Sequence, residues 1–166
     1  LGIAHAPLVG HSMGGTVSLA VAIQYPQRVK KVAVVGSPID GGSLSLLLKL
    51  LGIQPIARLA YRHMWGFRLF FRLCAPLYSK DPRWSQMMER DLSATTLESF
   101  LFSIASLRRT DLRPLLNQIT VPAMGMYGDK DIVVHPNQWQ PMLAGIQHAR
   151  IERFHQAGHF IMLDEP

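Results

Sequence analysis

Short apolar runs alternate with helical patterns along much of this chain. Four such runs predict buried or half-buried strands, at residues 6–9, 29–36, 121–127 and 149–154. The second is rich in β-branched residues, as buried parallel strands are, whereas the last alternates apolar and polar residues and is typical of a strand nearer a sheet edge. Because helical patterns separate the runs, we expect an α/β fold with a doubly wound parallel sheet and helical crossovers.

The pattern changes between the second and third runs, where no strand is convincing. Asp81-Pro82 predicts a helix start, with proline at the first helical position. The segment from Thr95 to Glu98 has the spacing of a capping box, and apolar residues follow it at helical intervals. Three more helices are expected earlier in this stretch, at residues 44–51, 56–65 and 67–78.

A Gly-x-Ser-x-Gly sequence directly follows the first predicted strand, and a helical pattern begins at Met13. A sharp turn between strand and helix strains the backbone at Ser12 and exposes its hydroxyl. Gly10 and Gly14 lack a Cβ, so we expect them to let the strand and the helix approach closely. The start of the helix would aim free N–H groups and its positive end at a developing oxyanion.

With its flanking strand and helix, the Gly-His-Ser-Met-Gly-Gly segment at residues 10–15 resembles the nucleophile elbow of the α/β-hydrolase family. The resemblance implies that Ser12 is the nucleophile and that the backbone N–H of Met13 is one oxyanion-hole donor. In the family the second donor follows an earlier strand. We therefore expect a C-terminal half of the fold that lacks its N-terminal half and is inactive alone. A glycine-rich turn with a passive serine is the alternative.

The family also carries a helical cap inserted between two strands, at the place of the helical stretch found here. The resemblance is good outside this stretch, which matches only in position and helical character. We therefore expect a partial hydrolase core formed by residues 1–39 and 111–166, with a helical cap over residues 40–110.

Two later segments resemble the rest of a catalytic triad. Gly128-Asp129-Lys130-Asp131-Ile132-Val133 is similar to the family's Gly-x-x-Asp-x-Val segment, which puts Asp131 in the position of the acid. Gly158-His159 is similar to the family's Gly-His segment, which makes His159 the base. The chain order of Ser, Asp and His is that of the family. We expect the Ser12 hydroxyl within hydrogen-bond reach of His159, and an Asp131 oxygen near the other ring nitrogen.

Other side chains compete for these roles. Asp129 lies two residues before Asp131 and is better suited to capping the turn, while Asp40 follows the second predicted strand. His155 is the nearest rival of His159, but it lacks the preceding glycine. The remaining histidines are expected to be surface, motif or packing residues: His5, His11, His63, His135 and His148.

Positive charge is concentrated in the helical stretch. Residues 40–110 contain ten Lys or Arg and five Asp or Glu, which accounts for +5 of the net charge of +6. Interleaved with Trp and Phe, this charge would suit an anionic lipid surface or an anionic substrate. A solvated helix face, with arginine stems lying over apolar surface, is the simpler interpretation. No motif supports nucleic-acid binding.

The resemblance implies a serine hydrolase that cleaves a carboxylic ester or a related acyl bond through an acyl-enzyme, with no cofactor and no metal. The cap supplies many apolar side chains, most of which are expected to pack inside the cap and the rest to line a pocket, so a small lipophilic molecule is the expected substrate. These side chains are Leu46, Leu47, Leu50, Leu51, Trp65, Phe67, Phe70, Phe71 and Trp84. The alternatives are a C–C hydrolase or a cofactor-free haloperoxidase on the same triad, and a non-catalytic binding protein of the same fold.

Overall fold

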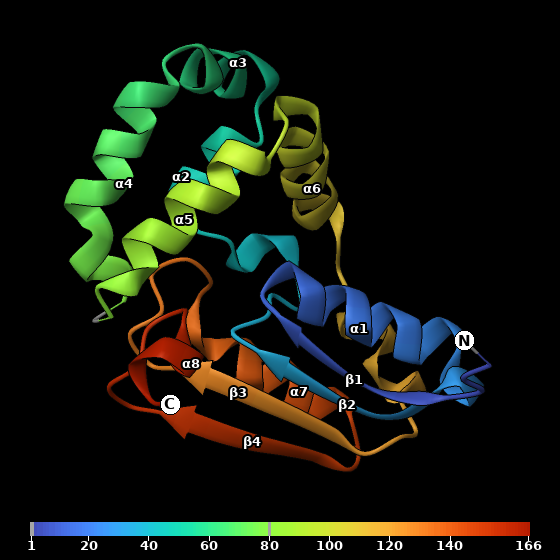
Figure 1. The fold of residues 1–166 in the computed structure, drawn as a ribbon. Helices are drawn as coiled ribbons and strands as arrows, with labels where there is room; N and C mark the ends of the chain where they lie inside the picture. The colour runs from blue at the N-terminus through green and yellow to red at the C-terminus, as the bar shows by residue number, and fades with distance from the viewer. Residues whose placement is uncertain (1, 80) are drawn as a thin grey trace.

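The computed structural model describes residues 2–79 and 81–166, and in these ranges it contains a parallel sheet. The strands are β1 (Ala6–His11), β2 (Val29–Val35), β3 (Ala123–Gly128) and β4 (Ala149–Phe154). They are hydrogen-bonded in the order β1-β2-β3-β4, and every neighbouring pair is parallel (Figure 1). All four predicted strands are confirmed, and β4 lies at an edge of the sheet as expected.

One face of the sheet is covered by helices. α1 (Met13–Gln24) joins β1 to β2, and α7 (Trp139–Gly145) joins β3 to β4. Apolar side chains of both helices pack with β2 and β3 in one core, because alternate residues of a strand point to the same face. The core includes Leu19, Ala22, Val32, Val34, Leu116, Tyr127, Met142 and Ile146.

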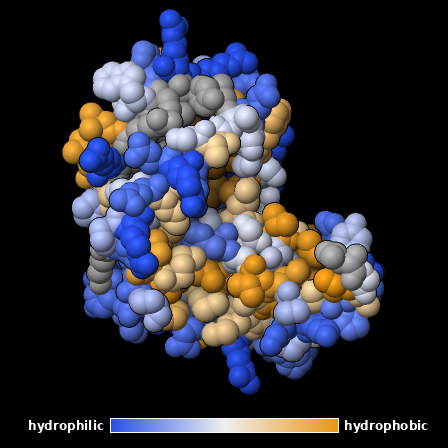
Figure 2. Space-filling model, in the orientation of Figure 1, coloured by the Kyte–Doolittle hydropathy of each residue, from blue (hydrophilic) through white to orange (hydrophobic). Residues whose placement is uncertain are grey.

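The opposite face is covered mainly at its carboxyl-terminal end. There α8 (Ile161–Asp164) packs Ile161 with Val35 and Ala157. Towards the other end of the strands, Val9 is 74% exposed and a hollow of about 890 Å³ lies over β1 to β4. Figure 2 shows apolar residues gathered in the region of α1 and β1.

In the described part of the stretch between β2 and β3, five α-helices stand over the carboxyl ends of the strands (Figure 1). They are α2 (Leu46–Leu51), α3 (Gln54–Arg62), α4 (Met64–Tyr78), α5 (Arg83–Ala94) and α6 (Leu97–Arg109). Within these helices the structure leaves out the side chains of Ala57, Ala60, Tyr61, Met64, Phe67, Arg68, Phe71, Leu92 and Leu97. Short 3₁₀ helices occupy Pro26–Arg28, Gly41–Ser43, Arg113–Gln118 and Pro136–Gln138.

The predicted helices 44–51, 56–65 and 67–78 correspond to α2, α3 and α4, with shifted boundaries. α3 begins earlier because Pro55 fits the first turn of a helix, where its missing N–H has no partner to lose. A break at His63 then separates α3 from α4. In the described ranges, none of the helices has the length and apolar character needed to cross a bilayer.

The capping box predicted from Thr95 to Glu98 is displaced by one residue. The side chain of Thr96 caps α6 by accepting from the backbone N–H of Ser99 at 3.1 Å. Thr95 instead donates its hydroxyl to the carbonyl of Asp91 at 2.8 Å, which closes the end of α5. Two adjacent threonines thus bond to two different helices. The predicted start of α6 is confirmed, but the prediction that Thr95 caps it was wrong.

Candidate active site

Ser12 occupies the turn between β1 and α1 with φ 52° and ψ −123°. It is the one non-glycine residue with a positive φ in the part of the chain that the structure describes. Its N–H donates to the carbonyl of Val35 at 2.8 Å, which ties the turn to the end of β2. Because a positive φ is costly for a residue with a Cβ, the predicted backbone strain at Ser12 is confirmed.

Close packing at this turn requires Gly10 and Gly15. A Cβ at Gly10 would lie 2.3 Å from the backbone of Gly14, and one at Gly15 would lie 1.9 Å from the Oγ of Ser37. The expectation for Gly14 was wrong, because a Cβ there would have no neighbour within 4 Å. The backbone of Gly14 faces the strand, while its missing side chain would point into open space.

Asp131 and His159 form a buried hydrogen-bonded pair. The Nδ1 of His159 lies 2.7 Å from the Oδ2 of Asp131, and the two residues are only 4% and 7% exposed. The other carboxylate oxygen accepts from the N–H groups of Val133 at 2.8 Å and Val134 at 2.9 Å. Since a carboxylate can only accept, His159 carries its proton on Nδ1 and leaves Nε2 available as a base. The predicted contact between acid and base is confirmed.

The elbow adjoins the loop that carries His159. The rings of His11 and His159 have centroids 4.8 Å apart, and the Nε2 of His11 lies 2.9 Å from the carbonyl oxygen of His159. Within the described residues, however, Ser12 Oγ makes no hydrogen bond to His159, so the expected direct bond is not formed. Catalytic hydrogen bonds are often long before substrate binds and tighten in the complex.

His11 anchors the His159 loop. Burial lowers the pKa of His11, and the charge of a protonated His159 would lower it further. The ring is therefore neutral near pH 7 and uses one nitrogen to donate to the carbonyl of His159. The sequence predicted that His11 would not transfer protons, but it did not reveal this anchoring contact.

Gly36 makes room for the acid–base pair. It follows β2 directly and has φ +54°. A Cβ at this position would lie 3.2 Å from the Nδ1 of His159 and 3.5 Å from the Oδ2 of Asp131. The apolar pattern marks this glycine only as the end of a strand, although a glycine between a buried strand and Ser37-Pro38 is typical of an unusual turn.

Asp164 is a second residue that sequence analysis missed. One carboxylate oxygen accepts from the N–H of Gly158 at 2.8 Å, directly before His159. The other accepts from the hydroxyl of Ser79, between α4 and α5, at 2.7 Å. Asp164 therefore links the loop of His159 to the helical insertion.

The rival residues contact each other and lie outside the buried pair. The Nδ1 of His155 lies 2.5 Å from the Oδ2 of Asp129, and Arg153 donates to the Oδ1 of the same carboxylate at 2.9 Å. These hydrogen bonds, first that of His155 and then that of Arg153, hold the pKa of Asp129 below its usual range. Asp40 accepts from the N–H of Gly42 at 2.8 Å, as a turn residue.

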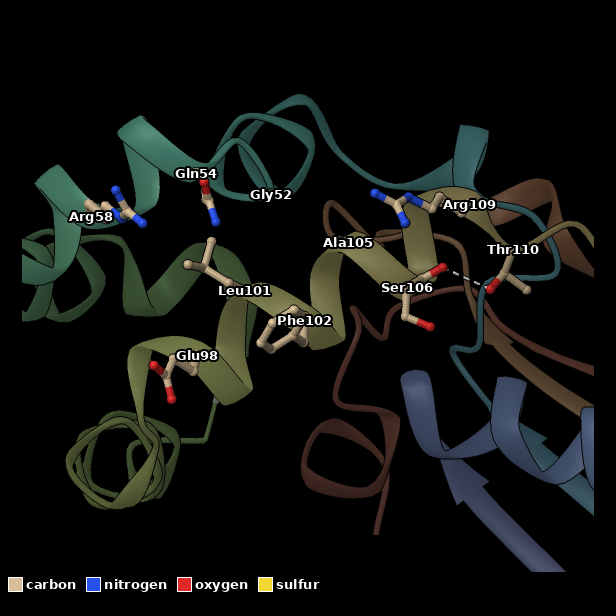
Figure 3. A pocket seen from close by; sticks show the side chains of 10 residues that line it. All are labelled: Gly52, Gln54, Arg58, Glu98, Leu101, Phe102, Ala105, Ser106, Arg109 and Thr110. Carbon is tan, nitrogen blue, oxygen red and sulfur yellow. Dashed lines mark hydrogen bonds between the residues drawn. The ribbon is translucent and has the colours of Figure 1, made fainter.

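A hollow of about 940 Å³ lies between α3 and α6 (Figure 3). Leu101 and Phe102 line it together with the guanidinium groups of Arg58 and Arg109, but none of the predicted catalytic residues does. Trp84, one of the apolar residues of the predicted cap, is 1% exposed and stacks on Tyr78, so it packs inside the cap.

Two further points concern apolar side chains of the cap and groups that could bind a metal ion. The side chains of Phe67 and Phe71, also among the apolar residues of the predicted cap, lie outside the described residues. In the ranges that the structure describes, no three His, Cys, Asp or Glu side chains are grouped to hold a metal ion.

The comparison with protein families matches the α/β-hydrolase fold over residues 1–166. The chain therefore belongs to the α/β-hydrolase fold family. It is 31% identical to a 2-hydroxy-6-oxo-6-phenylhexa-2,4-dienoate hydrolase from Comamonas testosteroni, over 96% of this chain and 58% of that protein. It is 26% identical to 3-oxoadipate enol-lactonase 2 from Acinetobacter baylyi, over 100% of this chain and 61% of that protein.

Solved structures show the same fold. An esterase from Exiguobacterium antarcticum superposes with a TM-score of 0.75 at 23% identity, over 96% of this chain and 61% of that one. An enol-lactonase from Burkholderia xenovorans superposes with a TM-score of 0.69 at 21% identity, over 96% of this chain and 60% of that one. The chain thus spans about three fifths of the length of these proteins.

Proposed function

We propose that this chain carries the catalytic triad of a serine hydrolase that attacks an acyl carbonyl group of a lipophilic substrate. Ser12 is the nucleophile, His159 the base and Asp131 the residue that orients His159. The observation that carries the proposal is the buried hydrogen bond between Asp131 and His159, beside the strained turn of Ser12. Burial strengthens this interaction, because few water molecules compete for the carboxylate.

The proposed reaction begins when Ser12 Oγ bonds to the carbonyl carbon and passes its proton to the Nε2 of His159. The backbone N–H of Met13, in the first turn of α1, donates to the resulting oxyanion, since it has no acceptor within the helix. The tetrahedral intermediate collapses to an acyl-enzyme, and the leaving alkoxide takes the proton from His159. Water then attacks the acyl-enzyme by the same route and releases the acid.

Hydrolysis of a C–C bond beside a ketone is the second candidate, and the names of the relatives favour it. The Comamonas protein is a 2-hydroxy-6-oxo-6-phenylhexa-2,4-dienoate hydrolase. A Pseudomonas protein, 30% identical over 96% of this chain and 58% of its own length, is a 2-hydroxy-6-oxononadienedioate/2-hydroxy-6-oxononatrienedioate hydrolase. Ser12 Oγ would bond to the ketone carbon while His159 takes the hydroxyl proton. The leaving group would then be a carbon atom that must be protonated, in place of an alkoxide oxygen.

A fluorophosphonate probe tests the triad in the full natural protein. We expect covalent labelling that disappears in Ser12→Ala and falls strongly in His159→Ala, because only an activated serine reacts. Labelling of the Ser12→Ala variant at an unchanged rate, or no labelling of the natural protein, would overturn the proposal and favour a non-catalytic member of the family.

Two substrates then separate the two reactions. A p-nitrophenyl ester with a medium-length acyl chain reports ester hydrolysis, and 2-hydroxy-6-oxo-6-phenylhexa-2,4-dienoate reports C–C hydrolysis. We expect the ester to be the better substrate by kcat/KM. A clear preference for the dienoate would replace the ester assignment with the second candidate and leave the roles of Ser12 and His159 unchanged.

A further inference from the structure

Positive charge in the helical insertion is not balanced by nearby acids in the sequence. Between Asp40 and Asp81 the chain has six Lys or Arg residues and no Asp or Glu. The six are Lys49, Arg58, Arg62, Arg68, Arg72 and Lys80. Of the arginine side chains that the structure describes here, those of Arg58, Arg62 and Arg72 are all exposed, and none pairs with a described carboxylate.

The same segment exposes a row of large apolar side chains on α4, which we call the α4 stripe. Trp65 is 73% exposed, Leu69 48%, Leu73 73% and Leu77 66%. Residues four apart lie on one face of a helix, so these side chains form a continuous row along α4. Farther round the helix, Cys74 and Tyr78 are partly buried.

The helix that carries the α4 stripe lies at an edge of the molecule (Figure 1). Figure 1 places α4 at the left edge of the helical insertion, where it packs against α3 and α5. Figure 2 shows apolar and hydrophilic residues side by side at this edge. Arg72 is three residues after Leu69 and therefore borders the α4 stripe. Apolar rows of this kind, bordered by polar residues, mark interaction surfaces.

We propose that the α4 stripe and its neighbouring arginines dock this protein onto an anionic lipid surface. A helix that exposes Trp and Leu on one face, with basic residues beside them, is suited to lie in the plane of a bilayer interface. The leucines enter the boundary of the acyl chains, Trp65 lies at headgroup level, and the arginines face lipid phosphates.

Charge favours a lipid surface over a second copy of the chain. Two α4 surfaces brought together would place Arg72 of each copy near that of the other, with no acid from residues 41–80 to pair with it. Like charges opposed across an interface weaken it. An anionic bilayer supplies both the negative charge and the apolar layer that this surface lacks.

Vesicle binding by the full natural protein tests the proposal. We expect it to co-sediment with vesicles of phosphatidylcholine and phosphatidylglycerol, and to bind vesicles of phosphatidylcholine alone far more weakly. The double variant Leu73→Ser/Leu77→Ser should bind the anionic vesicles roughly tenfold more weakly, because it removes apolar side chains that would enter the bilayer. Arg62→Gln/Arg72→Gln, which changes the exposed arginine three residues before Trp65 and the arginine beside Leu69, should lose the preference for phosphatidylglycerol.

A matched control is Leu143→Ser, which changes a leucine of α7 that is 51% exposed and lies outside the helical insertion. It should bind vesicles like the natural protein. The circular dichroism spectrum and the rate of hydrolysis of a soluble ester should be the same in Leu73→Ser/Leu77→Ser and in Leu143→Ser as in the natural protein. These two controls separate lipid docking from folding and from the proposed catalysis. Equal vesicle binding by the stripe variant and the control would overturn the proposal. The proposal would also be overturned if the natural protein bound no vesicles. It would be overturned as well if the natural protein were a dimer in solution and Leu73→Ser/Leu77→Ser made it a monomer, because the α4 stripe would then join two copies of the chain.

The fluorescence of Trp65 gives an independent measurement. The chain has three Trp residues, of which Trp84 is 1% exposed and Trp139 packs beneath Arg153. Brominated acyl chains in anionic vesicles should quench the tryptophan fluorescence of the natural protein. The substitution Trp65→Phe should remove most of this quenching. Quenching that persists in Trp65→Phe would contradict the docking orientation.

Discussion

Two Asp–His pairs lie close together in this chain, and they are built differently. Asp131 with His159 and Asp129 with His155 are each joined from a carboxylate oxygen to Nδ1, at 2.7 Å and 2.5 Å. The side chains of the first pair are 3% and 4% exposed, whereas those of the second are 23% and 73% exposed. Similar chemistry at similar spacing therefore occupies two very different environments.

The environments decide what each pair can do. Two backbone N–H groups hold the second oxygen of Asp131, so its orientation and that of His159 are fixed in a water-poor site. Asp129 is shared between His155 and Arg153 at the surface, where water competes for every contact. An exposed pair of this kind contributes only about 0–1 kcal/mol to folding. To keep a histidine base in one orientation, the acid beside it must be buried and must itself be held by further hydrogen bonds, as Asp131 is.

The largest expected effect separates the two histidines. His159→Ala should lower kcat/KM for an ester by about 10⁴–10⁶-fold, and adding Ser12→Ala should cost little more, because the two residues act as one unit. His155→Ala should stay within roughly twofold, since its partner is a surface carboxylate. Steady-state kinetics on the full natural protein provide the measurement, and comparable losses in both single variants would remove the distinction between the pairs.

The two acids should differ next. Asp131→Asn should lower kcat by about 10²–10⁴-fold, because an amide cannot hold His159 with its proton on Nδ1. Asp129→Asn should remain near the natural rate. The same ester assay decides the matter: a more damaging Asp129→Asn would show that the acid has been assigned to the wrong residue.

A smaller effect is expected where the buried pair depends on Gly36. Gly36→Ala puts a Cβ at φ +54° and 3.2 Å from the Nδ1 of His159, so we expect a loss of about 1–2 kcal/mol in the free energy of unfolding. Gly14→Ala is the matched control for stability, because a Cβ there meets nothing within 4 Å. Chemical denaturation compares the two, and equal stability would mean that Gly36 is not required beside the pair.

The smallest effect concerns pH and the surface pair. The pKa of Asp129 is lowered in the folded protein, so its contacts stabilise the fold above the unfolded-state pKa and are lost as pH falls through the folded value. The free energies of unfolding of the natural protein and Asp129→Asn should therefore differ at neutral pH and converge below about pH 4. A difference that instead grows on acidification would reverse the sign of this contribution.

Sequence patterns predicted the strands better than the caps and the contacts of the site. The apolar runs at β1 to β4 were found because a buried strand needs a continuous or alternating apolar pattern. The predicted cap residue of α6 was wrong by one position, since Thr95 and Thr96 are chemically equivalent. The hydroxyl of Thr95 bonds to the end of α5, which leaves Thr96 to cap α6. Gly14 was misjudged because the spacing of glycines does not show which Cβ would collide.

The sequence by itself determined the family, the order of the elements and the residue types proposed for catalysis. These depend on local motifs: a serine in a glycine-flanked turn, and an acid and a histidine after later strands. The pairing of Asp131 with His159 was predicted from these motifs, whereas only the tertiary structure showed that Asp129 pairs with His155, because that contact depends on how two loops meet at the edge of the sheet. The tertiary structure also revealed His11, Gly36 and Asp164, whose contacts join residues far apart in the chain. Such contacts form only after packing brings those segments together, so no local pattern records them.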